Sequence, residues 1–325
     1  MAPPEVPALP ARLGWRDVLG GWRVRWGIGR MRYAVAPGLY RVGAPGPASP
    51  VLVTANYKLT VDTVRRWLAG ISAWLLVLDT KGVNVWCSAG KGAFGAAELA
   101  RRIDAVHLRD VVTHRDLVLP QLAATGVAAH EVKRATGFSV HYGPVRARDI
   151  GAYLAGGMMA TPEMRCVRFG WKDRLAVAPV EIVAALGPLA AVLSALLALD
   201  LLHHHRVTAR GLAGMIPFAA AVLAGGLAVP WLLPWIPFRS FALKGAVAGA
   251  LAAAAVLPWL PLGPVALAGS ALLTMAIVSY MALMFTGSTT FTTLAGVRLE
   301  VRRALPPILL GAGAGALLRI AGEFF

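Results

Sequence analysis

The stretch Ala73-Trp-Leu-Leu-Val-Leu-Asp79-Thr-Lys-Gly-Val-Asn84-Val-Trp-Cys87-Ser-Ala-Gly-Lys91 decides the fold of the first half of the chain. Its first six residues are apolar without alternation, which is typical of a strand buried on both faces. Asp79 and the polar residues after it end that strand. A short helix-like segment with a cysteine follows. The stretch therefore predicts a buried strand with polar side chains at its carboxyl end.

Apolar runs and helical stretches alternate on both sides of this segment. We predict further strands at 51–55, 111–112, 127–129, 138–140 and 166–169, and helices at 61–69, 96–103 and 147–154. Strands that alternate with helices indicate a parallel sheet with crossover helices. The first half of the chain is therefore predicted to be an α/β domain of Rossmann-like form.

Polar and small residues gather where the predicted strands end, and parallel sheets bind ligands at the carboxyl ends of their strands. The candidates for a ligand pocket are Thr54, Asn56, Asp79, Thr80, Thr113, His114, Gln121, Gly143, Pro144 and Val145. Thr54 and Asp79 also suit a purely structural role in a turn or a helix cap.

The composition separates the two halves of the chain. Of 325 residues, 57% are hydrophobic and 15% charged, and the net charge is +16. Soluble globular proteins have about 25% charged residues, so an ordinary soluble enzyme is excluded, and so is a disordered chain. Residues 1–174 carry 24 basic and 12 acidic residues, and residues 175–325 carry 8 and 4. A basic soluble half therefore precedes an apolar half.

The apolar half predicts an all-α membrane domain. A span needs about 20 apolar residues, and five segments qualify, at 175–202, 212–234, 241–259, 262–285 and 304–321. If the N-terminal half is cytosolic, nine basic residues flank the spans inside and three outside, which agrees with the positive-inside rule. We expect a multi-pass protein of the cytoplasmic (inner) membrane in contact with the lipid bilayer. Its N-terminal domain is then cytosolic, with both thiols reduced.

These boundaries predict a basic aromatic segment at 1–50, a cytosolic domain at 51–172 and a transmembrane domain at 173–325. The first segment interleaves tryptophan and arginine. It therefore suits either an anionic membrane surface or packing on the domain. Nothing in the sequence resembles a nucleic-acid-binding module, so no nucleic acid is expected as a partner. His203–His205 suits a polar loop or a metal site, and the spans suit an anchor or, as a lesser alternative, a transporter.

Cys87 is the strongest candidate for chemistry. It lies at the predicted start of a helix, where backbone N–H groups favour a thiolate. Lys91 is four residues further on, on the same helix face. The segment is not a Walker A loop, because Lys91 is followed by Gly92, and it has no dinucleotide fingerprint. Cys166, the second cysteine, is expected to be an inert strand residue.

At Asn84-Val-Trp-Cys-Ser-Ala-Gly-Lys91 the sequence resembles the HgcA family, the corrinoid proteins of microbial mercury methylation, which are related to the large subunit of the corrinoid iron–sulfur protein of the acetyl-CoA pathway. Similar stretches are 54–58, 112–115, 119–122, 126–130, 143–146 and 160–165. The resemblance covers residues of about 50–175, and the spans by topology only.

The resemblance implies a soluble corrinoid-binding domain followed by five membrane spans, as predicted above. A cobalamin-type corrinoid would lie at the carboxyl ends of the strands. Cys87 thiolate would be the lower axial ligand of its cobalt. The residues that would shape the cap helix around the ring are Asn84, Val85, Trp86, Ser88, Ala89, Gly90 and Lys91. The predicted strand-end residues would line the rest of the pocket.

The resemblance also implies the reaction, a methyl transfer from the corrinoid cobalt to Hg(II) that yields methylmercury. A soft thiolate donor would push electron density toward the methyl group, easing its transfer as a carbanion. The implied partners are a small ferredoxin with two [4Fe–4S] clusters as electron donor and a methyl donor of the methyltetrahydrofolate type. Cys166 could then pass Hg(II). The alternatives are another soft metal, metalloid or C1 acceptor and, from a different class, a transporter or sensor with a non-catalytic cytosolic domain.

Overall fold

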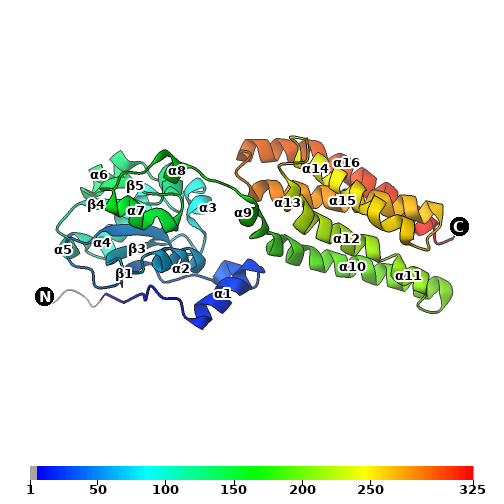
Figure 1. Cartoon of the computed structure of the whole chain (residues 1–325), viewed down its shortest axis with the longest axis horizontal. Coiled ribbons are helices and arrows are strands. Elements are labelled where there is room, and N and C mark those ends of the chain that lie inside the picture. The colour runs from blue at the N-terminus through cyan, green and yellow to red at the C-terminus, as the bar shows by residue number, and fades with distance from the viewer. Residues whose placement is uncertain (1–5, 325) are drawn as a thin grey trace. The chain divides into compact units, whose positions relative to one another are not determined.

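The computed structural model describes residues 6–324, and the chain divides into two compact units. The first holds residues up to 24 together with 28–167, and the second holds residues 25–27 together with those from 168 onward. Figure 1 shows an α/β unit for the first and a bundle of helices for the second. This agrees with the predicted fold class, an α/β domain followed by membrane-length helices.

The first unit is built on one five-stranded sheet. The strands are β1 (Gly38–Val42), β2 (Val51–Ala55), β3 (Ala73–Leu78), β4 (Asp116–Leu119) and β5 (Ser139–Tyr142), in the order β1-β3-β2-β4-β5. The last four are parallel, and β1 pairs with β3 in the antiparallel sense. The carboxyl ends of β3, β2, β4 and β5 therefore lie side by side.

Helices cover both faces of the sheet. Helices α2 (Lys58–Trp67) and α7 (Ile150–Ala155) cover one face, over a core that includes Leu75. The opposite face is covered by α3 (Val85–Gly90), α4 (Ala96–Ala105), α5 (Leu108–Val111) and α6 (Ala129–Thr136). The other elements of this unit are α1 (Trp15–Arg25), η1 (Arg30–Arg32), η2 (Gln121–Thr125), η3 (Ala147–Asp149) and α8 (Pro162–Arg165).

The chain order reverses at β2, because β3 lies on one side of it and β4 on the other. Right-handed crossovers then place α2 on one face of the sheet and α3 to α6 on the other. The loops that leave β2 and β4 part toward opposite faces. In open parallel sheets a ligand crevice forms at such a switch point, outside the carboxyl ends.

Some strand predictions are confirmed and others are wrong. The strands at 51–55 and 73–78 have the predicted bounds, and that at 138–140 is found one residue later, as β5. The strand at 111–112 is instead the end of α5 and the residue after it. The predicted strand at 127–129 is the loop before α6 and the first residue of that helix, and residues 166–169 form no strand. Runs of two to four residues are too short to show a period. Val112 and Val127 are buried beside helices, whereas no residue of 166–169 is buried.

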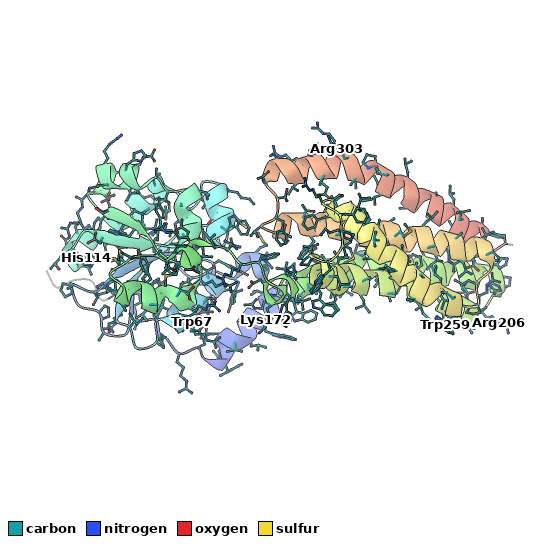
Figure 2. The ribbon with its side chains drawn as sticks, turned by 45° about the horizontal axis from the view of Figure 1, so that its top comes forward. Trp67, His114, Lys172, Arg206, Trp259 and Arg303 are labelled. Carbon is teal, nitrogen blue, oxygen red and sulfur yellow. The ribbon has the colours of Figure 1, made fainter. Side chains whose placement is uncertain are left out.

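The second unit consists of helices. They are α9 (Trp171–Leu175), α10 (Ala178–His204), α11 (Ala209–Ala213), α12 (Ile216–Leu223), η4 (Ala224–Ala228), α13 (Val229–Leu232), α14 (Phe241–Val256), η5 (Leu257–Trp259), α15 (Pro264–Phe285), η6 (Thr286–Ser288) and α16 (Leu294–Ala321). Together they form five segments that are long and apolar enough to cross a membrane. Figure 2 places Trp259 and Arg206 at one end of this unit and Arg303 at the other.

The five segments differ in how they are buried. The middle helix α15 packs on α12, α14 and α16, and half of its most apolar stretch is buried. The most apolar stretch of α10 has no buried residue. The outer helices, α10 above all, therefore expose apolar side chains, as helices that face lipid do. The His203–His205 run ends α10, with His203 and His204 inside the helix and His205 at its cap, and Asp200 accepts hydrogen bonds from Thr208 N and Oγ1 in the turn that follows.

Candidate functional site

The polar turn after β3 is held by a side chain from the end of β2. Asn56 Oδ1 accepts hydrogen bonds from Thr80 N (3.2 Å) and Gly82 N (2.9 Å), and Thr80 Oγ1 lies 2.8 Å from it. Asp79 Oδ1 accepts from Lys81 N at 3.1 Å. Asn56 and Thr80 are buried. These three predicted pocket residues therefore fix the course of the turn that leads into α3.

Helix α3 begins with a side-chain cap. Asn84 Oδ1 accepts a hydrogen bond from Cys87 N at 2.9 Å, which satisfies one of the N–H groups that a helix start leaves without a partner. Ser88 Oγ is buried and donates to the Asn84 carbonyl oxygen at 2.5 Å. Asn84 and Ser88 thus shape the helix from within. The helix has only six residues, so its dipole is small.

The two faces of α3 differ sharply. Val85, Ser88 and Ala89 are buried against the core of the sheet. Cys87 is exposed, Trp86 is 42% exposed, and Gly90 and Lys91 are exposed as well. A Cβ atom at Gly90 would meet no other atom within 4 Å. The outer face therefore presents a thiol beside an indole, with room for a flat group one turn further on.

A close backbone contact seats α3 at the carboxyl ends of the strands. A Cβ atom at Gly126 would lie 2.7 Å from Ala89 O and closer still to Phe94 O, so only glycine fits there. Gly126 ends η2, which follows β4, and α3 packs mainly on η2 and also contacts β2. Cys87 is thus carried by a helix placed over the β2–β4 switch point.

The next loops complete this edge. Gly143 N donates to the Leu119 carbonyl at 2.7 Å, and Gly143 and Pro144 are buried just after β5. Val145 N donates to the Met164 carbonyl at 2.8 Å, and Arg165 Nη1 lies 3.3 Å from Gln121 Oε1. The sequence reasoning placed Gln121, Gly143, Pro144 and Val145 at carboxyl ends of strands, and the structure does so too.

Two buried hydroxyls on the α2–α7 face have no hydrogen-bond partner among the described residues, those of Thr54 and Tyr153. Thr54 lies near the end of β2, and the Tyr153 ring is close to Gly143. Burial raises the pKa of Tyr153 above its usual value of about 10, so its neutral hydroxyl is a donor at physiological pH. Sequence reasoning missed Tyr153. Its signal was a hydroxyl-bearing aromatic on the inner face of the predicted helix 147–154.

The prediction that Thr113 and His114 follow a strand is wrong. Both precede β4, so they lie at the amino end of the sheet. His114 Nε2 lies 2.9 Å from the Ser49 carbonyl and its Nδ1 accepts from Asp116 N, while Thr113 Oγ1 lies 3.3 Å from the Pro47 carbonyl. Figures 1 and 2 show α3 and His114 at opposite ends of the unit. These two residues hold a loop and are not part of the site.

Comparison with known proteins finds a family match within the first unit. Residues 29–154 match the family model of the CO dehydrogenase/acetyl-CoA synthase delta subunit. The gamma subunit of the acetyl-CoA decarbonylase/synthase complex of Archaeoglobus fulgidus is 40% identical over 122 residues, which is 37% of this chain and 26% of that protein. The gamma subunit of Methanocaldococcus jannaschii is 34% identical over 127 residues, 38% of this chain and 26% of that protein.

The chain thus spans about a quarter of the length of these curated relatives. The family match ends at residue 154, before the first of the membrane-length helices begins at Trp171. Within the described residues, no group of three or more His, Cys, Asp or Glu side chains is placed to hold a metal ion. The site therefore offers a metal one thiol rather than a set of protein ligands.

Proposed function

We propose that the chain is a membrane-anchored, corrinoid-dependent methyltransferase that transfers a methyl group to Hg(II), with Cys87 thiolate as the lower axial ligand of cobalt. The observation that carries the proposal is the exposed Cys87 thiol on the outer face of α3, over the carboxyl ends of a parallel sheet. The likeness to subunits of acetyl-CoA-forming complexes supports a corrinoid, since the HgcA family that the sequence resembles is related to the corrinoid protein of that pathway.

The residues at this edge fit a corrinoid. The ring is flat and carries amide side chains, so it needs an open surface and peripheral hydrogen bonds. The outer face of α3 offers the surface, because Gly90 has no side chain beside Cys87. The partnerless hydroxyls of Thr54 and Tyr153 offer buried donors and acceptors, which cost about 1–3 kcal/mol each when left unsatisfied. In the described part of the chain, no group of three or more His, Cys, Asp or Glu side chains is placed to compete with this thiol for cobalt.

When bound, a corrinoid supplies a cobalt atom that accepts a methyl group from a donor and transfers it to an acceptor. The residues of this chain position the thiol and shape the surface around it. Asn84 and Ser88 fix the first turn of α3, so the direction of Cys87 is set by hydrogen bonds rather than by the cofactor. Gly126 lets α3 lie close to the sheet. Trp86 would cover the ring of a bound corrinoid, and Thr54 and Tyr153 would bind groups at its periphery.

The same proposal includes partners and a location. The chain has two cysteines in all, so it cannot hold a four-cysteine iron–sulfur cluster. We therefore propose that a small ferredoxin with two [4Fe–4S] clusters supplies electrons, and that a methyltetrahydrofolate-type donor supplies the methyl group. The five membrane-length helices would anchor the protein in the cytoplasmic membrane with the first unit cytosolic.

The proposal is tested by anaerobic single turnover with the full chain. Purified protein loaded with methylcobalamin is mixed with Hg(II), and methylmercury is quantified beside the cobalt content and visible spectrum. We expect methylmercury from the wild-type protein and from Cys166→Ala, but from Cys87→Ala no more than free methylcobalamin forms without protein. The spectrum of Cys87→Ala should shift even where corrinoid is retained.

Other results would change specific parts of the proposal. Bound corrinoid without methylmercury would retain the cofactor and redirect the acceptor toward another soft metal or metalloid. Full activity in Cys87→Ala would refute the thiolate ligand. Protein that retains no corrinoid in wild-type form would refute the cofactor itself and leave the transporter or sensor alternative.

A further inference from the structure

A cavity of about 620 Å³ lies in the second unit between α14, α15 and α16. Its volume is within the range of small-molecule sites, about 300–1,000 Å³. Helix α16 approaches α15 closely toward its C-terminal end. There a Cβ atom at Gly269 would lie 2.7 Å from the Gly315 carbonyl. The N-terminal part of α16, from Gly296 to Gly311, lines the cavity and includes Pro306 and Pro307.

The cavity has a charged mouth. Arg239, Glu300 and Arg303 are its charged lining residues. Glu300 Oε1 is already engaged, because it accepts from Ser240 Oγ at 2.9 Å and from Ala242 N at 3.0 Å and so caps α14. The two arginines are exposed and make no hydrogen bond or ion pair among the described residues. The mouth is therefore net positive and has two guanidinium groups to offer.

Beyond the mouth the wall is apolar. Helix α16 carries four charged residues between 298 and 303 and none from 304 to 318. The lining continues from Arg303 to Gly311, which at 1.5 Å per residue is about 12 Å along the helix. The charged end of α16 is thus the level of a membrane interface, and the cavity extends from that level into the apolar layer.

We propose that this cavity binds one anionic phospholipid, with its phosphate between Arg239 and Arg303 and one acyl chain along the apolar wall. Guanidinium groups pair with phosphate oxygens through two parallel hydrogen bonds. Basic pockets between membrane helices on the cytoplasmic side suit anionic headgroups. The proposal depends on the five helices crossing a bilayer and is independent of the corrinoid chemistry.

The headgroup contact is tested by native mass spectrometry of the full chain in detergent. Phosphatidylglycerol and phosphatidylcholine with the same acyl chains are added separately. We expect one phosphatidylglycerol to be retained about tenfold more strongly. Arg239→Gln with Arg303→Gln should remove the preference. Arg298→Gln with Arg302→Gln is the matched control, since these arginines lie on the same helix outside the cavity lining, and should retain it.

The acyl-chain contact has its own pair of variants. A Cβ atom at Gly311 or at Gly313 would meet nothing within 4 Å, so both positions tolerate a side chain, but only Gly311 lines the cavity. Gly311→Leu should fill the wall and release the lipid, and Gly313→Leu should not. Equal retention of the two lipids by wild-type protein would overturn the proposal. So would competition by glycerol phosphate with unchanged binding in Gly311→Leu, which indicates an anion site alone.

Helix α1 carries a second, independent surface. Its exposed apolar residues are Trp15, Val18, Leu19 and Trp22, between 48% and 71% exposed. Their spacing of three, four and seven residues places them in one stripe. The opposite side is fixed to the first unit, because Gly21 and Val24 are buried and Asp17 pairs with Lys58 at 2.6 Å and Arg65 at 2.7 Å. The stripe is therefore held outward.

Arginines flank the stripe on both sides, at Arg16, Arg23 and Arg25. We infer that α1 lies in the headgroup layer of an anionic bilayer, with the stripe in the acyl boundary and the arginines toward lipid phosphates. The five membrane-length helices of the same chain would bring it to such a surface. This favours the membrane interpretation of residues 1–50 over simple packing.

Spin labels at single cysteines test this in full-chain protein reconstituted into phosphatidylglycerol-containing nanodiscs, in a Cys87→Ser, Cys166→Ser background. A label at Leu19→Cys should be more accessible to oxygen than to a water-soluble nickel chelate. One at the exposed Lys133→Cys of α6 should show the reverse. Greater nickel accessibility at position 19 would overturn the inference. So would dipolar broadening there, which indicates that a second copy covers the stripe.

Discussion

The two ends of the parallel sheet differ in how their polar groups are used. At the amino end, both His114 ring nitrogens are engaged by backbone groups. At the carboxyl end, Asn56, Thr80 and Asn84 are also engaged, and they hold a turn and a helix that present an exposed thiol. Near this same end the hydroxyls of Thr54 and Tyr153 lack partners. Residue type alone does not distinguish the two ends, but hydrogen bonding does.

This difference separates residues that build the site from residues that meet a ligand. A polar group whose bonds are all made within the protein has none left for a ligand. The hydrogen bonds of Asn56 Oδ1, Asn84 Oδ1 and the Thr80 and Ser88 hydroxyls hold the turn and the start of α3, so these four are positioning residues. Cys87, Trp86, Thr54 and Tyr153 are then the residues that we propose to contact the corrinoid. The predictions below test this division from the largest expected effect to the smallest.

The largest effect is expected at Cys87. Cys87→Ala should reduce methyl transfer to the rate without protein, since no other described side chain stands ready as the axial ligand. Cys166→Ala should leave the rate unchanged, although that thiol is exposed too. Both variants are measured by methylmercury formed in a single turnover. Equal losses in the two variants would show that α3 does not define the site.

Gly126→Ala should be the most destabilising change at the carboxyl end. The added Cβ would collide with the carbonyl oxygens of Phe94 and Ala89, which belong to backbone and cannot turn aside. Overpacking of this kind costs about 1–3 kcal/mol. Thermal unfolding should show the loss, and corrinoid retention should fall with it because α3 is displaced. Gly137→Ala, at the end of α6 where a Cβ has space, is a comparison for backbone strain alone.

Thr54→Val and His114→Ala should have opposite effects. Thr54→Val replaces a partnerless hydroxyl by a methyl group of similar shape, so stability should be unchanged or higher while corrinoid affinity falls. His114→Ala removes two hydrogen bonds to backbone groups, so stability should fall by about 1–3 kcal/mol with corrinoid affinity unchanged. Unfolding midpoints and corrinoid titrations measure both. A weaker corrinoid affinity in His114→Ala would contradict the division between the two ends.

The smallest effect concerns the attachment of α1. Burial raises the pKa of Asp17, but hydrogen bonds from Lys58 and Arg65 outweigh it and hold that pKa well below its usual value. The pair therefore stabilises the fold above the unfolded carboxyl pKa of about 3.9. This stability, about 1 kcal/mol, is lost as the pH falls below that value. At neutral pH Asp17→Asn should have a slightly lower unfolding midpoint than wild type, and the difference between the two proteins should shrink as the pH falls below that value.

Much of the fold was predictable because a long apolar run shows both its period and its length, which together distinguish a strand from a helix. The strands 51–55 and 73–78 and all five membrane-length segments are apolar over enough residues to be unambiguous. Shorter features were not. β1 lies at the sheet edge with Arg41 in it and shows no clear alternation. The doublet Val111–Val112 looked like a strand but completes a helical turn. Sequence separation also gives no strand order, so the switch point required the structure.

The site was predictable in part for the same reason. Cys87 was identified from its local setting, and the structure places it on an exposed helix face. Asn84 and Ser88 were assigned to the cofactor because they flank it, yet their hydrogen bonds turn inward. Tyr153 was missed because a hydroxyl without a partner can be recognised only when all its neighbours are known. Thr113 and His114 were misplaced because an incorrect strand end was used to locate them.

One side of helix α3 packs on the core of the sheet, and the other side carries the exposed Cys87 thiol. The inner side, with Val85, Ser88 and Ala89, is constrained by the core. The outer side is not, so residue 87 can be exchanged over evolutionary time at little cost in folding. A lineage could therefore acquire or discard a thiol at this position by a single codon change within the same fold. Chains that share the inner residues but differ at this position should fold alike and catalyse different reactions.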